Sequence, residues 1–201
     1  MDDAWKTSLR DTFRESFYFF ERALRDCPDS LWEESLWPVR ERAPTRHGLG
    51  AELPEAERRQ AYSAFWFVAW HTLNVAHYDI EGEELPEGWG APPPFDAYIT
   101  DAGTLPPRVW KRDEIFEHCA LTWRRIDEIV AGLTDERVAR TVPTPHRYAG
   151  RPYAWLLLMC LTHTRDHVAQ LDLFLGQRGV VRALRRSGRM PAPISLASGS
   201  A

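Results

Sequence analysis

The sequence contains no run of about 18 uncharged apolar residues, the length that a membrane-spanning helix requires. Its N-terminus lacks a basic stretch followed by an apolar one, so we expect no secretory signal either. Cysteine is scarce, and Cys27, Cys119 and Cys160 are widely spaced without a CxxC pair. This spacing argues against a disulfide framework and favours reduced thiols. Together these absences predict a cytoplasmic protein with no membrane span.

Neither sign of charge dominates the sequence. It has 25 basic against 29 acidic residues, a net charge of -4 and a pI of about 6.0. This balance gives no reason to expect a nucleic acid or an anionic membrane as a partner. Hydrophobic residues make up 44% and aromatic residues 12%, with nine tryptophans, which is enough for one domain with a sizeable core.

Four segments repeat apolar residues every three or four positions, the pattern of amphipathic helices. They cover residues 3–26, 54–82, 113–131 and 153–177, and a further short helix is expected at 31–36. No segment alternates convincingly between apolar and polar residues, so we expect no sheet. Long helices with apolar stripes bury them against each other, which predicts an all-α four-helix bundle.

The links between the predicted helices are rich in proline and glycine. The longest, residues 83–111, contains six prolines and is expected to be a connection and not a helix. Such a long connection can cross the end of the bundle, which lets the second and third helices run parallel. We therefore place the domain at residues 1–179 and expect an arginine-rich, flexible tail at 180–201.

Two histidines stand on one face of the fourth predicted helix. His163 and His167 are four residues apart, so their side chains differ by roughly 40° around the axis. Their neighbours on this face are mostly of core type, among them Leu156, Met159 and Phe174. A buried imidazole without a partner costs roughly 1–3 kcal/mol, so something should satisfy both rings. A shared metal ion does so, and buried carboxylates or hydroxyls are the alternative.

A third ligand has to come from another helix, and the second predicted helix offers His71 and His77. Both stand among apolar residues, and periodicity does not separate them. Six residues apart, they cannot both face one metal from a straight helix. The motif is also not the HExxH of zincins, because Thr164 stands where the general base would be. The other histidines are expected at the surface or around the ligands: His47, His118 and His146.

Over roughly residues 5–177 the chain resembles the DinB/YfiT-like superfamily of candidate metalloenzymes. It has that family's order of features: a helix with one inward histidine, a long crossover, and a last long helix with HxxxH. In the family this motif commonly continues with a small residue and Gln, as in HTRDHVAQ at residues 163–170. Ala169 stands where many relatives have Gly. The resemblance selects His71 as the third ligand and implies an up-down-down-up bundle that is often a homodimer.

The resemblance further implies one divalent metal ion, zinc, nickel or iron, held by His71, His163 and His167 with at least one open position. Such an ion acidifies a bound water or binds a thiolate. Relatives include transferases and isomerases that use low-molecular-weight thiols. We therefore expect a metal-dependent enzyme that activates a thiol or water for transfer, isomerisation or hydrolysis of a small molecule. Three residues are candidates for the surroundings of the ligands: Cys160, Asp166 and Gln170.

Two alternatives stay open at this level. One is a non-catalytic helical bundle that binds a metal or a small ligand. The other has no metal, and its histidines are hydrogen-bonded in the core.

Overall fold

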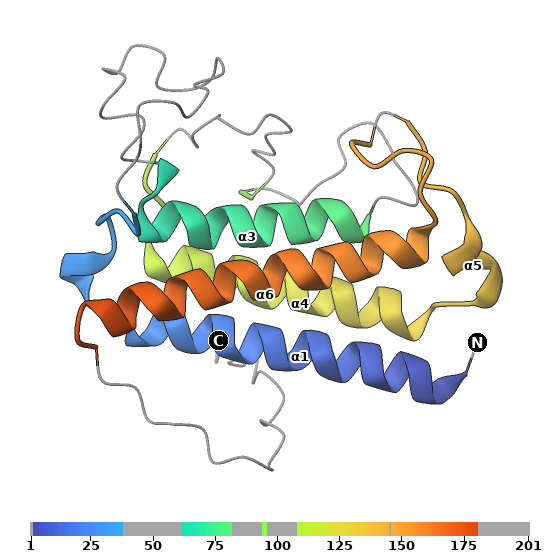
Figure 1. Cartoon of the computed structure of the whole chain (residues 1–201), viewed down its shortest axis with the longest axis horizontal. Coiled ribbons are helices and arrows are strands. Elements are labelled where there is room, and N and C mark those ends of the chain that lie inside the picture. Colours follow the sequence, from blue (N-terminus) through green and yellow to red (C-terminus); the bar gives the residue numbers. More distant parts are fainter. Residues whose placement is uncertain (1, 38–61, 82–93, 96–107, 145, 181–201) are drawn as a thin grey trace, which may run out of the picture.

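Four long helices make up most of the structure, a computed structural model that describes residues 2–37, 62–81, 94–95, 108–144 and 146–180 (Figure 1). The long helices are α1 (Asp3–Asp26), α3 (Phe65–Ile80), α4 (Arg112–Ala131) and α6 (Tyr153–Gln177). Two short elements accompany them, the 3-10 helix η1 (Asp29–Leu31) and helix α5 (Asp135–Ala139). The described residues contain isolated bridges but no β-strand, so the all-α prediction is confirmed. None of the described helices is long and apolar enough to cross a bilayer.

Each long helix packs against two others, because α1 and α3 both contact α4 and α6. Tyr153 at the start of α6 donates a hydrogen bond to the carbonyl of Ile80 at the end of α3, so these two helices are antiparallel. Glu81, directly after α3, pairs with Arg125 near the end of α4, so α3 and α4 run in the same direction. The directions along the chain are therefore up, down, down and up (Figure 1).

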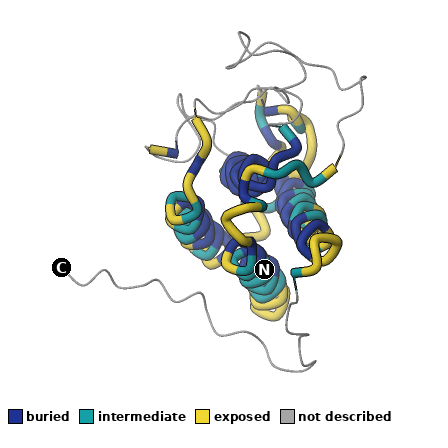
Figure 2. The backbone as a smooth tube through the Cα atoms, turned by 90° about the vertical axis from the view of Figure 1, so that its left-hand side faces the viewer, coloured by how far each residue is buried: buried dark blue, intermediate teal, exposed yellow. Residues whose placement is uncertain are grey.

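The apolar stripes of the helices face inward and form one core (Figure 2). Helix α1 begins at Asp2, whose side chain accepts a hydrogen bond from the Ala4 amide and so caps the helix. Trp5 continues the apolar spacing of this helix but is 37% exposed in the first turn. The apolar residues that follow at the same spacing are buried: Leu9, Phe13, Phe17, Phe20 and Leu24.

A break at Ser63 and Ala64 interrupts the second predicted helix. Tyr62 is helical, helix α3 starts at Phe65, and the predicted residues 54–61 lie outside the described part of the chain. Just before the helix, the Ser63 carbonyl accepts a hydrogen bond from Leu36, and the Phe65 amide donates one to Glu34. Ala64 has extended backbone angles and forms an isolated bridge with Ser35. This pairing draws the backbone out of a continuous helix.

The same pairing overturns the prediction of a short helix at residues 31–36. Only one 3-10 turn forms, at Asp29–Leu31, because the backbone that follows it is hydrogen-bonded to the start of α3. Helix α5 was not predicted, although Thr134 accepts a hydrogen bond from the Arg137 amide and caps it.

The ends of the third and fourth long helices agree with the sequence. Gly132 caps α4, and α6 covers the predicted residues 153–177. Most of the predicted links at 38–53 and 83–111, and residues 181–201 of the predicted tail, lie outside the described residues.

Candidate metal centre

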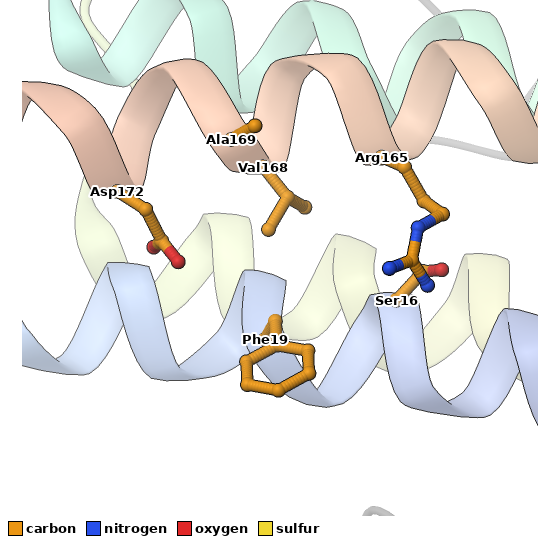
Figure 3. A pocket seen from close by; sticks show the side chains of 6 residues that line it. All are labelled: Ser16, Phe19, Arg165, Val168, Ala169 and Asp172. Carbon is orange, nitrogen blue, oxygen red and sulfur yellow. The ribbon is translucent and has the colours of Figure 1, made fainter. Parts of the chain in front are cut away.

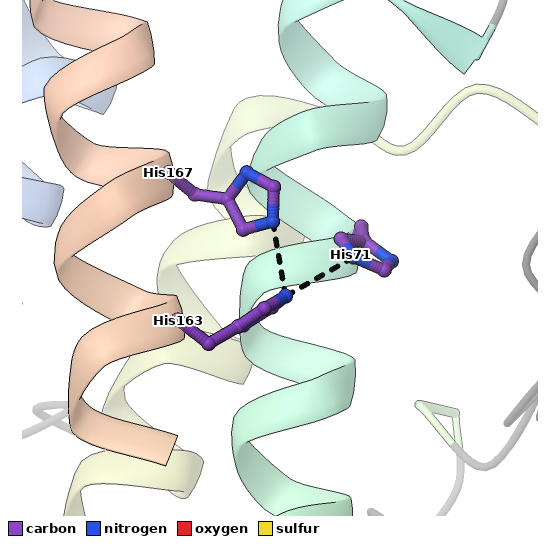
Figure 4. Close-up of side chains that lie close together, drawn as sticks. All are labelled: His71, His163 and His167. Atoms are coloured by element: carbon purple, nitrogen blue, oxygen red, sulfur yellow. Dashed lines mark hydrogen bonds between the residues drawn. The ribbon is translucent and has the colours of Figure 1, made fainter. Parts of the chain in front are cut away.

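Three imidazoles from two helices converge at one point between α3 and α6 (Figure 4). The Nε2 atom of His163 lies 3.3 Å from Nε2 of His71 and 3.0 Å from Nε2 of His167. Candidate ligand atoms of all three residues lie within 4.8 Å of one another. Among the described residues, this group is the one set of three or more candidate ligands that the structure brings together, and it contains no carboxylate or thiol.

Helix register explains why these three residues meet. The four-residue spacing of His163 and His167 stacks their rings on the face of α6 that points to α3. The antiparallel packing of α3 and α6 then brings His71 level with them. His77 belongs to another face of α3: its ring lies 6.4 Å from that of His118 on α4. Packing therefore brings His71, and not His77, to His163 and His167.

The nitrogen separations suit a single metal ion. With bonds of about 2.0–2.1 Å, two imidazole ligands are about 3.3–3.4 Å apart on a tetrahedron and about 2.9 Å apart at adjacent octahedral positions. The observed separations of 3.0 and 3.3 Å fall in this range. The three nitrogens are of one chemical type, which suits a borderline metal such as zinc, nickel or iron(II). Nδ1 of His163 points away from this centre and is buried without a hydrogen-bond partner among the described residues.

The electrostatics of the site keep the three rings neutral. Burial, helped by the His167 imidazole and the Arg147 cation, lowers the pKa of His71 to about 3. Burial, with His167, His71 and Arg147, lowers the pKa of His163 to about 2. Burial also lowers the pKa of His167, against the opposing effects of Gln170 and Asp166. At pH 7 each ring is thus in the form that binds a metal.

Of the three residues expected around the ligands, Gln170 contacts a ligand directly, and Asp166 and Cys160 do not. Nδ1 of His167 is hydrogen-bonded to Oε1 of Gln170 at 2.8 Å, so Nδ1 carries the proton and Nε2 directs a lone pair at the other rings. Asp166 is exposed and acts on His167 only through its charge. The buried Cys160 thiol donates to the Ala76 carbonyl, and burial raises its pKa well above its usual value. Cys160 is therefore a packed, protonated thiol beside the site.

An aromatic ring flanks the ligands, and a buried ion pair lies further along α3. The Phe67 ring stacks on His71 with centroids 6.1 Å apart and an angle of 20°. About two turns along α3 from His71, the Arg147 guanidinium donates to both oxygens of Asp79 at 3.1 Å. Asp79 is only 1% exposed, and its burial raises its pKa to about 6 against the effect of Arg147. This pair was not predicted from the sequence, although an aspartate within the apolar run of α3 is a signal for a buried partner.

The remaining histidines lie apart from the three. His118 and His146 were expected at the surface or around the ligands, but both are buried. His118 stacks on Phe95, and His146 stacks on Tyr78. His47 lies outside the described residues.

A shallow groove of about 240 Å³ lies on another face of α6, against α1 (Figure 3). It is separate from the three histidines, and its lining is mixed: Ser16, Phe19, Arg165, Val168, Ala169 and Asp172.

The fold and the site thus define an all-α protein with a three-histidine candidate metal centre between two helices. The chain belongs to the DinB superfamily, whose family model matches residues 20–171. The match includes α3 and both ligand positions of α6. No significant match was found among curated proteins or among solved structures.

Proposed function

We propose that the protein is a metal-dependent enzyme that binds one divalent ion through His71, His163 and His167 and acts on a small molecule. The observation that carries this proposal is the convergence of three neutral imidazoles that have no carboxylate among them. Zinc, nickel and iron(II) all accept three nitrogen ligands. When bound, such an ion supplies a Lewis acid that lowers the pKa of a coordinated water or thiol.

The protein's other residues orient the ligand rings and determine the surroundings of the metal. Gln170 holds the proton on Nδ1 of His167, and this fixes the ring orientation. The Phe67 ring lies nearly parallel to the His71 ring and gives that side of the ligand an apolar neighbour. The described residues provide three ligands, and the proposal leaves a further coordination position for the reacting group. An open position favours transfer, isomerisation or hydrolysis over a purely structural metal, for which four protein ligands are typical.

The test uses protein loaded with cobalt(II), titrated with azide and with small thiols. A change in the visible absorption of cobalt with saturation is expected, because the added ligand enters the open position. A matched variant, His163→Ala, should bind no cobalt and give no such spectrum. If the wild-type spectrum does not respond to either ligand, the site is closed and the metal is structural.

A further inference from the structure

A second pair of buried histidines lies between α3 and α4, away from the three-histidine centre. The ring of His77 lies 6.4 Å from that of His118. The two residues are only 3% and 0% exposed. Nδ1 of His77 and both ring nitrogens of His118 have no hydrogen-bond partner among the described residues. Buried polar groups in native proteins are rarely left unpaired, so these nitrogens indicate a ligand that completes them.

The distance between two imidazole rings depends on the angle at a metal ion that both rings bind. With a metal–nitrogen bond of about 2.0–2.1 Å, the ion lies about 3.2 Å from each ring centroid. Two such centroids are then about 5.2 Å apart at a tetrahedral angle, about 4.5 Å at a right angle and about 6.4 Å when the rings are opposed.

The three-histidine centre shows the first two of these spacings. The centroid of His71 lies 5.2 and 5.1 Å from those of His163 and His167, which are 4.4 Å from each other. The 6.4 Å between His77 and His118 instead matches two rings on opposite sides of one ion.

The charges around His77 favour Nδ1 as its ligand atom. Its Nε2 lies 4.0 Å from the carboxylate of Glu81, which Arg125 holds in an ion pair. A carboxylate behind the ring is a common companion of a metal-binding imidazole. Burial lowers the pKa of His77 to about 4 against the opposing effect of Glu81, and burial with His77 lowers the pKa of His118 to about 3. Both rings are therefore neutral at pH 7, as metal binding requires.

The surroundings of His118 are aromatic. The Phe95 ring lies nearly parallel to that of His118, at 4.6 Å and 10°, and 5.4 Å from that of Trp110. Among the described residues, no third histidine, cysteine or carboxylate joins this pair in a common ligand group. Two opposed nitrogens do not suit zinc, which takes four ligands. They suit Cu(I), a closed-shell monovalent ion that is stable with two opposed ligands and binds imidazole.

We propose that His77 and His118 form a second metal site, which binds one Cu(I) ion between Nδ1 of His77 and a ring nitrogen of His118. The site does not depend on the proposed function, because neither residue belongs to the three-histidine centre. Its affinity for divalent ions is low, since it offers them only two ligands.

The experiment titrates Cu(I) under exclusion of oxygen into His163→Ala protein, whose three-histidine centre lacks one ligand. Competition with a chromogenic Cu(I) chelator measures binding, and X-ray absorption identifies the ligands. We expect one Cu(I) per chain with two nitrogen ligands in a linear arrangement. Adding His77→Leu or His118→Leu should abolish this binding. The two substitutions lie on different helices, and circular dichroism with melting temperature verifies that each variant folds.

Two further substitutions in the same parent protein serve as controls. Thr122→Val changes another buried polar residue one turn along α4 and should keep the Cu(I) ion. Cys119→Ala removes the buried thiol next to His118 and should keep it too, because burial raises the pKa of this thiol well above its usual value.

Three results would overturn the proposal. One is the absence of Cu(I) binding in the parent protein. Another is binding that survives both His77→Leu and His118→Leu, which would place the ion elsewhere. The third is sulfur among the ligands together with loss of the ion in Cys119→Ala, which would make the thiol the ligand.

Discussion

Replacing His118 by Leu should make the protein less sensitive to acid. His118 lies on α4 with both ring nitrogens buried and without partners among the described residues. Burial is the main cause that lowers the pKa of His118 to about 3, and the neighbouring His77 adds a smaller effect. In the unfolded chain its pKa returns to about 6.5. Between these two values the unfolded state binds a proton that the folded state does not, so stability is present above about pH 6.5 and is lost as the pH falls.

The size of the effect follows from the difference in proton binding. At pH 5 the unfolded state gains about 2 kcal/mol from protonating this one histidine, and at pH 7 it gains almost nothing. His118→Leu should therefore reduce the loss of stability between pH 7 and pH 5 by about 2 kcal/mol. For a chain of this size, that corresponds to about 4–8 °C less decrease in the melting temperature.

The assay is thermal or urea unfolding of wild type and variant between pH 7 and pH 5, with a chelator present so that metal binding does not contribute. Thr122→Val is the matched control, because Thr122 lies one turn further along α4, is buried and does not titrate. Its pH dependence should equal that of the wild type. If His118→Leu also shows the wild-type pH dependence, His118 is not desolvated in the folded protein and the reasoning is refuted.

Two further substitutions and the oligomeric state can each be tested. Thr122→Val should raise the melting temperature at every pH, since it removes a buried hydroxyl that has no partner among the described residues; a lower value would show that the hydroxyl is satisfied. Gln170→Leu should weaken metal binding by roughly 10–100-fold in a competition assay with a chelator, because His167 loses the partner of its Nδ1, and an unchanged affinity would contradict this role. Dimerisation, which the family resemblance implies, should give twice the mass of one chain in light scattering at micromolar concentration, and a monomer mass would contradict it.

The sequence predicted the helices best where local signals and packing agree. The period of apolar residues and the glycine after residue 131 locate α4 to within one residue, and α6 agrees at both ends. The break before α3 was not predictable in this way. Ala64 has no unusual side chain, and its extended backbone results from hydrogen bonds with residues more than 25 positions earlier. Long-range backbone pairing leaves no local pattern.

In the candidate site, too, local spacing predicts some residues, and others come together only through packing. The spacing of His163 and His167 was sufficient to place them on one face, because four residues are close to one helical turn. The choice between His71 and His77 needed either the family resemblance or the packing of α3 between α4 and α6. Asp79 in the apolar run of α3 indicates a buried partner, but its partner Arg147 could not be predicted, since it comes from a segment between helices that meets the end of α3.

The most direct test of the account is the metal content of the purified protein and of two variants, determined by elemental analysis after growth in metal-supplemented medium. The wild type should contain about one divalent ion per chain, bound through the three converging imidazoles. His163→Ala should contain none while keeping the helical circular dichroism of the wild type. His77→Gln, which changes a histidine on another face of α3, should keep the ion. A wild-type protein without metal, or a loss of metal in His77→Gln but not in His163→Ala, would contradict the central claim.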